Sequence, residues 1–145
     1  MKRIIILLAI TVCQLSAMAQ KDLHIGALFD GKIVAQDKMV ETRVRGRSLS
    51  KYGLTYFRSL RFSPNSKEEK TIKQLLKEDM EEQTVENYRS REDDDNALYQ
   101  VFIELPPQGD KKRMLCYKQH FEKVLVIYLE GPQATFKTLE KMTNK

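Results

Sequence analysis

Cys116 and His120 stand four residues apart and are the residue types from which a thiol–imidazole nucleophile is built. On a helix this spacing would make them neighbours, whereas along a strand they would lie about 13 Å apart. The sequence around them predicts a strand, which argues against a dyad. A lone cysteine can also link two chains or be buried as a small hydrophobic residue, and we favour burial. We assign no catalytic residue.

The run from Glu92 to Asn96 begins with four consecutive acids. A calcium loop of the EF-hand type needs ligands at alternating positions, a glycine for its tight turn and a distant glutamate, and this run has no such glycine. We interpret it as a solvated loop and expect no metal and no cofactor. Glycine-rich phosphate loops and common hydrolase motifs are also missing. Because paired carboxylates need no fixed spacing, an envelope hydrolase using unidentified carboxylates is the alternative function.

Basic and acidic residues are segregated along the chain. Residues 20–64 carry nine basic and four acidic side chains, a net charge of +5, whereas residues 65–96 carry six and eleven, a net charge of −5. The candidate binding residues are Arg43, Arg45, Arg47 and Lys51, which could bind an anionic glycan, a lipid or an acidic envelope protein. Alternatively, they pair with the acidic helix of the same molecule or keep a sheet face soluble. We expect a binding domain, not a nucleic-acid-binding protein; a homodimer is compatible with the sequence.

Residues 1–19 have the three parts of a secretory signal peptide. Lys2 and Arg3 give a positive start, residues 4–12 are apolar, and Ala17-Met18-Ala19 matches a cleavage site. The apolar run is shorter than the roughly 20 residues that span a bilayer. We therefore expect an exported protein, periplasmic or secreted, with no membrane segment after cleavage.

Residues 20–145 have the length of a single domain. Cys116 is the only cysteine in this range, so no disulfide can form within it and a packed core must stabilise the fold. Cys13 follows the bulky Val12, which argues against a lipoprotein cleavage site there.

The longest predicted element is a helix from Ser63 to about Arg91. Ser66 and Glu69 have the spacing of a capping box at its start. The residues of its apolar stripe, which predict packing on a core, are Ile72, Leu75, Leu76 and Met80. The stripe weakens afterwards, so we expect the helix to fray between Gln83 and Arg91.

Strands are predicted on both sides of this helix. Residues 21–38 are compatible with a short helix or an irregular strand, and we favour the helix. We then expect a strand over 40–45 with one solvent-exposed face, a turn over 46–53 and a strand over 54–62. After the long helix we expect strands over 99–105, ended by two prolines, over 114–119 and over 123–130, then a short closing helix. The strand over 123–130 is apolar on both faces, which places it in the middle of the sheet. The expected fold is a two-layer α+β domain, an antiparallel sheet of about five strands with one long helix packed on one face and short helices near both termini.

Three parts of the sequence resemble a known family. They are the secretion signal ending AMAQ, the segment VETRVRGRSLSKYGLTYFRSL, and VLVIYLEG followed by a short helix. Together they resemble the small exported domains of unknown function found in Bacteroidetes bacteria and catalogued as DUF6108, and more weakly those catalogued as DUF4252. The resemblance spans nearly all of residues 20–145 and implies export to the envelope and a compact α+β domain. It implies no catalytic residue.

Overall fold

The computed structural model describes residues 23–81 and 87–143. The predicted signal peptide lies outside these residues and stays a prediction. The elements are α2 (Gly26–Phe29), the 3-10 helix η1 (Gln36–Lys38), β1 (Val40–Arg45), the 3-10 helix η2 (Arg47–Tyr52), β2 (Tyr56–Phe62), α3 (Ser66–Glu81), β3 (Asn87–Asp93), β4 (Leu98–Gln108), β5 (Lys111–His120), β6 (Lys123–Gly131) and α4 (Phe136–Thr143). Over the described part of the chain, no helix is long and apolar enough to span a membrane.

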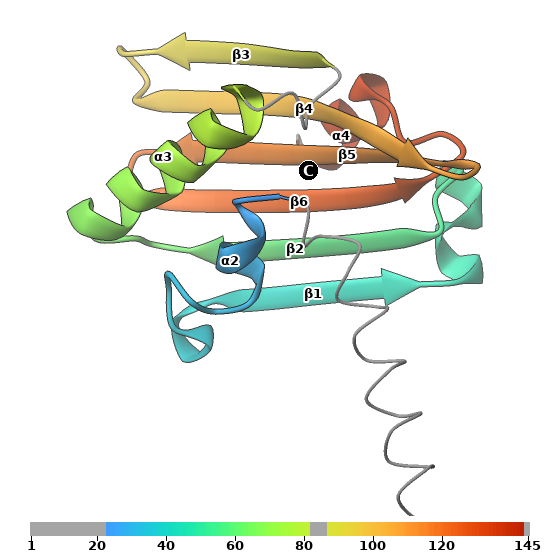
Figure 1. Cartoon of the computed structure of the whole chain (residues 1–145), viewed down its shortest axis with the longest axis horizontal. Helices are drawn as coiled ribbons and strands as arrows, with labels where there is room; N and C mark the ends of the chain where they lie inside the picture. Colours follow the sequence, from blue (N-terminus) through green and yellow to red (C-terminus); the bar gives the residue numbers. More distant parts are fainter. Residues whose placement is uncertain (1–22, 82–86, 144–145) are drawn as a thin grey trace, which may run out of the picture.

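The six strands form one antiparallel sheet in the order β1-β2-β6-β5-β4-β3. Strands β1 and β2 make a hairpin, and β3 to β6 make a meander that ends beside β2. Helix α3 lies between the two parts in sequence and runs across one face of the sheet (Figure 1). The α+β class is confirmed, whereas the expected five strands were one too few.

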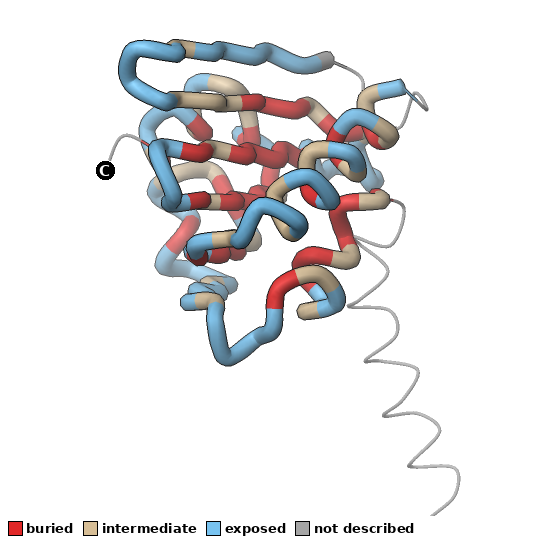
Figure 2. Tube along the Cα trace, turned by 90° about the vertical axis from the view of Figure 1, so that its left-hand side faces the viewer, coloured by how far each residue is buried: buried red, intermediate tan, exposed pale blue. Residues whose placement is uncertain are grey.

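The missed strand is β3, which occupies residues where the long helix was predicted to fray. Its sequence, NYRSRED, is polar on both faces and carries no alternating apolar signal. Backbone pairing with β4, with Tyr88 opposite Ile103 and Ser90 opposite Val101, makes it a strand. Figure 2 shows most of β3 exposed, whereas buried residues occur in β4 beside it.

Two apolar clusters occupy opposite faces of the sheet. Side chains of β6 alternate between them: Val126 packs with Ile72 of α3, and Ile127 packs with Leu139 of α4. The central position predicted for this strand is confirmed. The two-layer prediction is wrong, because α4 covers the face opposite α2 and α3 and the domain has three layers. We call these faces the α3 face and the α4 face.

Helix α3 begins with a capping box, one residue earlier than predicted. The backbone N–H of Glu68 donates to Asn65 Oδ1 at 2.8 Å, and the N–H of Asn65 donates to Glu68 Oε1 at 3.0 Å. Ser66 is therefore the first helical residue and not the cap. The predicted stripe is confirmed, since Ile72 and Leu76 are fully buried in the core.

Strand β4 continues through the two prolines that were expected to end it. Its pairing with β5 shifts register between Leu105 and Gln108. Proline lacks the N–H needed for regular pairing, so the strand continues only through this irregularity. The freed carbonyl of Pro106 accepts a hydrogen bond from Nε of buried Arg113 at 2.9 Å.

The edge strand β1 is more exposed than its alternating pattern predicted. Val40 is 67% exposed, and only Val44 packs against the α4-face cluster. The predicted antiparallel hairpin with β2 is confirmed, with Thr42 opposite Ser59. Short helices near both ends of the described chain, α2 and α4, are also confirmed.

Candidate functional site

Arg43, the first of the predicted binding residues, is held by its own hairpin. Its Nε donates to Oε1 of Glu41, and Nε of Arg58 donates to the same oxygen at 2.7 Å. Partial burial would raise the pKa of Glu41, but the hydrogen bonds from Arg43 and Arg58 outweigh it and lower that pKa. The carboxylate therefore stays ionised between two cations.

The other three predicted residues lie farther along the same corner of the fold. The guanidinium of Arg45 stacks 4.8 Å from the ring centroid of Tyr56, and Lys51 Nζ lies 5.0 Å from that of Tyr52. Arg47 is exposed in η2, where its carbonyl accepts from Ser50 Oγ at 2.7 Å. The structure thus places all four near the end of β1, but none of them lines the three clefts described below.

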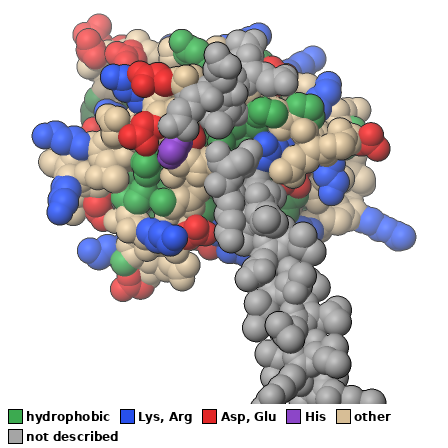
Figure 3. Space-filling model, in the orientation of Figure 1, with side chains coloured by type: hydrophobic (Ala, Val, Ile, Leu, Met, Phe, Trp, Pro, Cys, Tyr) green, Lys and Arg blue, Asp and Glu red, His purple; other side chains and the backbone are tan. Residues whose placement is uncertain are grey.

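Two acids of α3, Glu69 and Glu78, pair with residues outside the basic hairpin. Lys73 Nζ lies 3.0 Å from Glu69 Oε1 in the same helix, and Nδ1 of His24 lies 3.6 Å from Glu78 Oε2. The hydrogen bond from Lys73 holds the pKa of Glu69 below its ordinary value. Acidic and basic side chains are consequently interspersed over this face (Figure 3). The charge segregation of the sequence does not become a single-signed surface here.

A cleft of about 690 Å³ lies where strand ends meet the end of α4. We call it the cationic cleft; its basic side chains are Lys38, Arg61, Lys118 and Lys123, and its apolar ones include Val40, Leu125 and Met142. Among the described residues that line it there is no carboxylate. Its volume lies within the range of small-molecule sites.

Strand register explains how the cationic cleft is assembled. Directly opposite residues in antiparallel strands share a face. Val40 is opposite Arg61, Arg61 is opposite Leu125, and Leu125 is opposite Lys118. One row across four strands therefore alternates apolar and cationic side chains. The sequence pattern gave no signal for this, because the row exists only once the strand order is known.

A smaller cleft of about 370 Å³ borders the other side of this region. Thr143 lines both clefts, and the smaller one adds Arg89, Arg91 and Glu140. Arg89 also lies 4.3 Å from the ring centroid of Phe136 on α4. The α4 face is therefore rich in cations around the end of α4.

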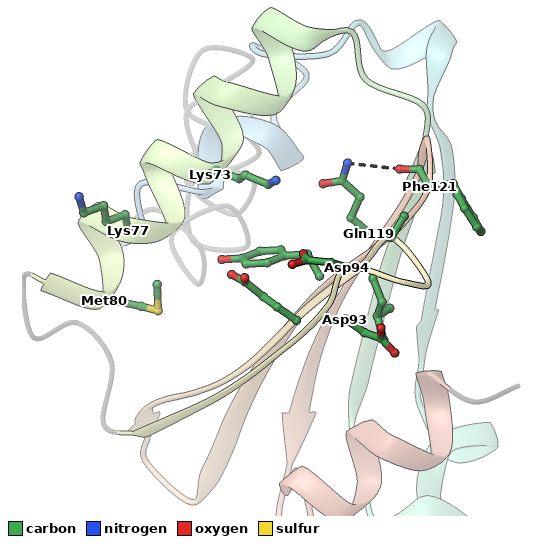
Figure 4. A pocket seen from close by; sticks show the side chains of 11 residues that line it. Lys73, Lys77, Met80, Asp93, Asp94, Gln119 and Phe121 are labelled. Atoms are coloured by element: carbon green, nitrogen blue, oxygen red, sulfur yellow. Dashed lines mark hydrogen bonds between the residues drawn. The ribbon is translucent and has the colours of Figure 1, made fainter.

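The acidic run borders a third cleft, of about 650 Å³, on the α3 face. Lys73 and Lys77 of α3 lie on one side of it, and Asp93 and Asp94 lie on the other (Figure 4). Asp93 accepts from Nδ2 of Asn96 at 2.8 Å, which with its other hydrogen bonds lowers the pKa of Asp93. The predicted solvated loop is confirmed for Asp94 to Asn96, which lie in a turn, but the first two residues of the run, Glu92 and Asp93, belong to β3.

The two turns beside this third cleft hold residues with unusual backbone angles. Ala97 has φ 47° and Phe121 has φ 56°, a region that residues other than glycine rarely adopt. The N–H of Phe121 donates to the carbonyl of Ala97 at 3.0 Å, and Gln119 Nε2 donates to the carbonyl of Phe121 at 3.3 Å (Figure 4). These contacts join the two turns and fix one wall of the cleft.

Cys116 is fully buried within the α4-face cluster. Burial raises the pKa of its thiol to about 12. His120 is exposed at the end of the same strand. The expectation of a buried cysteine is confirmed, and a protonated thiol does not act as a nucleophile at neutral pH.

Three buried charged residues were missed in the sequence: Arg113, described above, Asp79 and Arg58. Asp79 is fully buried and accepts from the backbone N–H groups of His24 at 2.6 Å and Ile25 at 2.9 Å. Arg58 donates to the carbonyl of Phe29 at 3.0 Å. Asp79 lies three residues after Leu76 on the apolar stripe, and an acid at that position was a readable signal of a buried partner. Asp79 and Arg58 fasten the segment around α2.

Comparison with known proteins gives one assignment. No curated protein matches the chain. A model of a family of unknown function, DUF6108, matches residues 12–143, which agrees with the resemblance seen in the sequence. The match includes all but the first residues of the chain and its last two. The protein therefore belongs to the DUF6108 family of unknown function.

Proposed function

We propose that this protein is a non-enzymatic binding module of the cell envelope and that its cationic cleft binds an amphipathic anion. The ligand would have a carboxylate or phosphate head and an alkyl part. The observation that carries this proposal is the row of Val40, Arg61, Leu125 and Lys118, in which cations flank apolar side chains without any lining carboxylate among the described residues.

The proposed binding surface therefore lies on the opposite face of the basic hairpin from Arg43 and Arg45, two of the candidate residues identified in the sequence. Arg43 and Arg45 point their charged groups at Glu41 and Tyr56. Arg61 lies on β2 and lines the cationic cleft, where no anion within the lining residues neutralises it. An incoming acidic head group would supply that anion at close range.

The test measures binding of three probes with the same alkyl chain: octanoate, octyl phosphate and uncharged 1-octanol. Calorimetric titration of the full chain is expected to detect the two anions and not the alcohol. Preference between the anions identifies the head group. Equal binding of all three, or of none, would contradict the proposal.

Variants locate the site. Arg61→Gln and Lys118→Gln are each expected to weaken anion binding about tenfold, which corresponds to about 1.4 kcal/mol. Arg47→Gln removes the same charge outside the cleft and serves as the matched control. If Arg47→Gln weakens binding as much as the cleft variants, the interaction is a general charge effect.

We also propose export, which rests on the sequence pattern of residues 1–19. N-terminal sequencing of the protein from cell envelope and medium is expected to begin at Gln20. A chain that retains Met1 in every fraction would contradict this.

A hydrolase would need two carboxyl groups in one cleft, one of them with a raised pKa. The pKa values of the Glu41, Glu69 and Asp93 carboxyl groups are lowered, which is opposite to what a general acid needs. No observation favours this alternative over a binding module.

A further inference from the structure

Among the described residues, the sheet has two edge strands, β1 and β3, each with one side unpaired in the order β1-β2-β6-β5-β4-β3. An edge strand presents open backbone N–H and C=O groups to which another strand can add. Whether two copies of the same edge can pair depends on which side chains then lie opposite each other. The two edges of this sheet differ sharply in that respect.

We propose that two copies of this chain associate through β1, antiparallel, with Thr42 opposite the partner's Thr42. In this register Glu41 lies opposite the partner's Arg43, and Val40 lies opposite the partner's Val44. The sequence Val-Glu-Thr-Arg-Val of residues 40–44 is thus complementary to itself when reversed. The twofold axis is perpendicular to the sheet, so the two six-stranded sheets become continuous and both α4 faces lie on the same side.

The charges select this register over the others available to β1. A twofold axis at Glu41 would place Glu41 opposite the partner's Glu41, and an axis at Arg43 would place Arg43 opposite the partner's Arg43. An axis at Val44 would place Arg43 opposite the partner's Arg45. The axis at Arg43 also places Glu41 opposite the partner's Arg45, but only the axis at Thr42 brings unlike charges together without a like-charge pair. Like charges directly opposite destabilise a strand pair.

Contacts within one copy already hold side chains of β1 in positions that this pairing would use. Glu41 and Arg43 are already hydrogen-bonded on one face of β1, so the pairing would join two such pairs into a ring of four alternating charges. On the other face Val40 is 67% exposed and is one of three large apolar side chains exposed among the described residues. The partner's Val44 would cover it.

Ser90, the position in the opposite edge strand that matches Thr42, is protected from the same association. An axis at Ser90 of β3 places Arg89 opposite the partner's Arg91, and an axis at Arg89, Arg91, Glu92 or Asp93 places that charged side chain against its own copy. Charged edges of this kind keep strands from pairing. Ser90, the position in β3 that corresponds to Thr42 in β1, therefore provides an internal control.

The decisive experiment is disulfide trapping with the full chain in a Cys13→Ser background. Thr42→Cys puts a thiol on the twofold axis, where opposite Cα atoms of antiparallel strands lie about 4.5–5.5 Å apart, within the span of a disulfide. Mild oxidation is expected to give a covalent dimer of Thr42→Cys and at least tenfold less dimer of Ser90→Cys. Buried Cys116 is common to both and is not expected to react.

Charge reversal tests the register. Arg43→Glu, added to Thr42→Cys, places a glutamate opposite the partner's Glu41 twice and is expected to reduce the trapped dimer at least tenfold. Arg47→Glu, outside the strand, is expected to leave the yield unchanged. Circular dichroism confirms that each variant is folded. Equal trapping by the two edges, no trapping at Thr42→Cys, or equal effects of the two reversals would overturn the proposal.

Sedimentation of the chain without engineered cysteines provides an independent measurement. Its mass is expected to rise with concentration from 17.0 kDa towards twice that value, and Arg43→Glu is expected to stay at the lower mass. A dimer of equal strength in Arg43→Glu would mean that another surface is used. None of these results depends on a ligand in the cationic cleft, so this proposal and the proposed function fail separately.

Discussion

The two faces of the sheet are covered by helices that are fastened in different ways. On the α3 face, buried Asp79 accepts two backbone N–H groups from the segment around α2. On the α4 face, the side-chain hydrogen bonds described for α4 join residues of its own segment, such as Thr143 Oγ1 to the carbonyl of Leu139 at 3.0 Å. Apolar packing therefore holds α4, whereas directional contacts also hold the α3 face. The α4 face, whose helix is held mainly by apolar packing, carries the cationic cleft.

One of the two largest expected effects comes from breaking the anchor on the α3 face. Asp79→Ala would leave the buried N–H of Ile25 and the partly buried N–H of His24 without their acceptor, and it is expected to lower the free energy of unfolding by about 3 kcal/mol. Urea denaturation measures this loss. Asp79→Asn keeps one acceptor oxygen and is expected to lose about half as much. A loss below about 1 kcal/mol for the alanine variant would mean that water replaces the carboxylate and that the faces are fastened alike.

The corresponding change on the α4 face acts through packing. Leu139 is fully buried, and Leu139→Ala is expected to cost about 3 kcal/mol. Because no described side-chain hydrogen bond ties α4 to the strands, we expect its amides to exchange hydrogen by local opening while those of β6 stay protected. Hydrogen exchange measured by mass spectrometry distinguishes the two. Simultaneous loss of protection in α4 and β6 would show that α4 is as firmly held as α3.

The loss of stability at alkaline pH tests whether solvent reaches the α4-face cluster. The pKa of the Cys116 thiol is raised from an ordinary 9.0 to about 12. A pKa that is higher in the folded state than in the unfolded state stabilises the native protein, and this contribution is complete below pH 9. The contribution is lost as the pH rises from 9 towards 12, because the thiol of the unfolded chain ionises first. Between pH 8 and pH 10 the loss is expected to be about 1.4 kcal/mol.

Tyr117 and Tyr128, whose pKa values burial also raises, contribute in the same direction. Cys116→Ala is therefore the control, and it is expected to lose less stability than the unaltered chain over the same pH interval. Equal losses in the two proteins would mean that solvent reaches the thiol and that the cluster is wet.

The smallest effect concerns the start of α3 and separates two candidate caps. Asn65→Ala removes the acceptor of the Glu68 N–H and is expected to cost about 1 kcal/mol. Ser66→Ala is expected to change stability by less than about 0.5 kcal/mol, as for an ordinary exposed residue. Thermal unfolding of the two variants side by side measures the difference. The reverse order would restore the capping box predicted from the sequence.

Elements with a strong apolar pattern were predictable, and elements with a polar one were not. The stripe of α3 and the continuous apolar run of β6 both led to correct placements, because burial on a core imposes their periodicity. Strand β3 was missed because its backbone pairing with β4 requires no apolar face. The second helical layer was missed because the apolar spacing in the sequence of α4 does not indicate which face of the sheet the helix covers.

The candidate sites divide in the same way. Burial of Cys116 was predictable from its residue type, since an uncharged thiol in an apolar strand packs as a hydrophobic residue. The cationic cleft was not predictable, because Val40 and Lys118 are brought into one row only by the placement of β6 between β2 and β5.

The sequence by itself determined that this chain builds an α+β core and that its charges are divided between a basic hairpin and an acidic helix, and it favoured burial of Cys116 over a reactive thiol. These properties follow from residue type and spacing along one segment. Tertiary structure decided which charges meet. It paired Arg43 with Glu41 in its own hairpin and left Arg61 beside a cleft, because the distance between side chains on different strands depends on strand order and register.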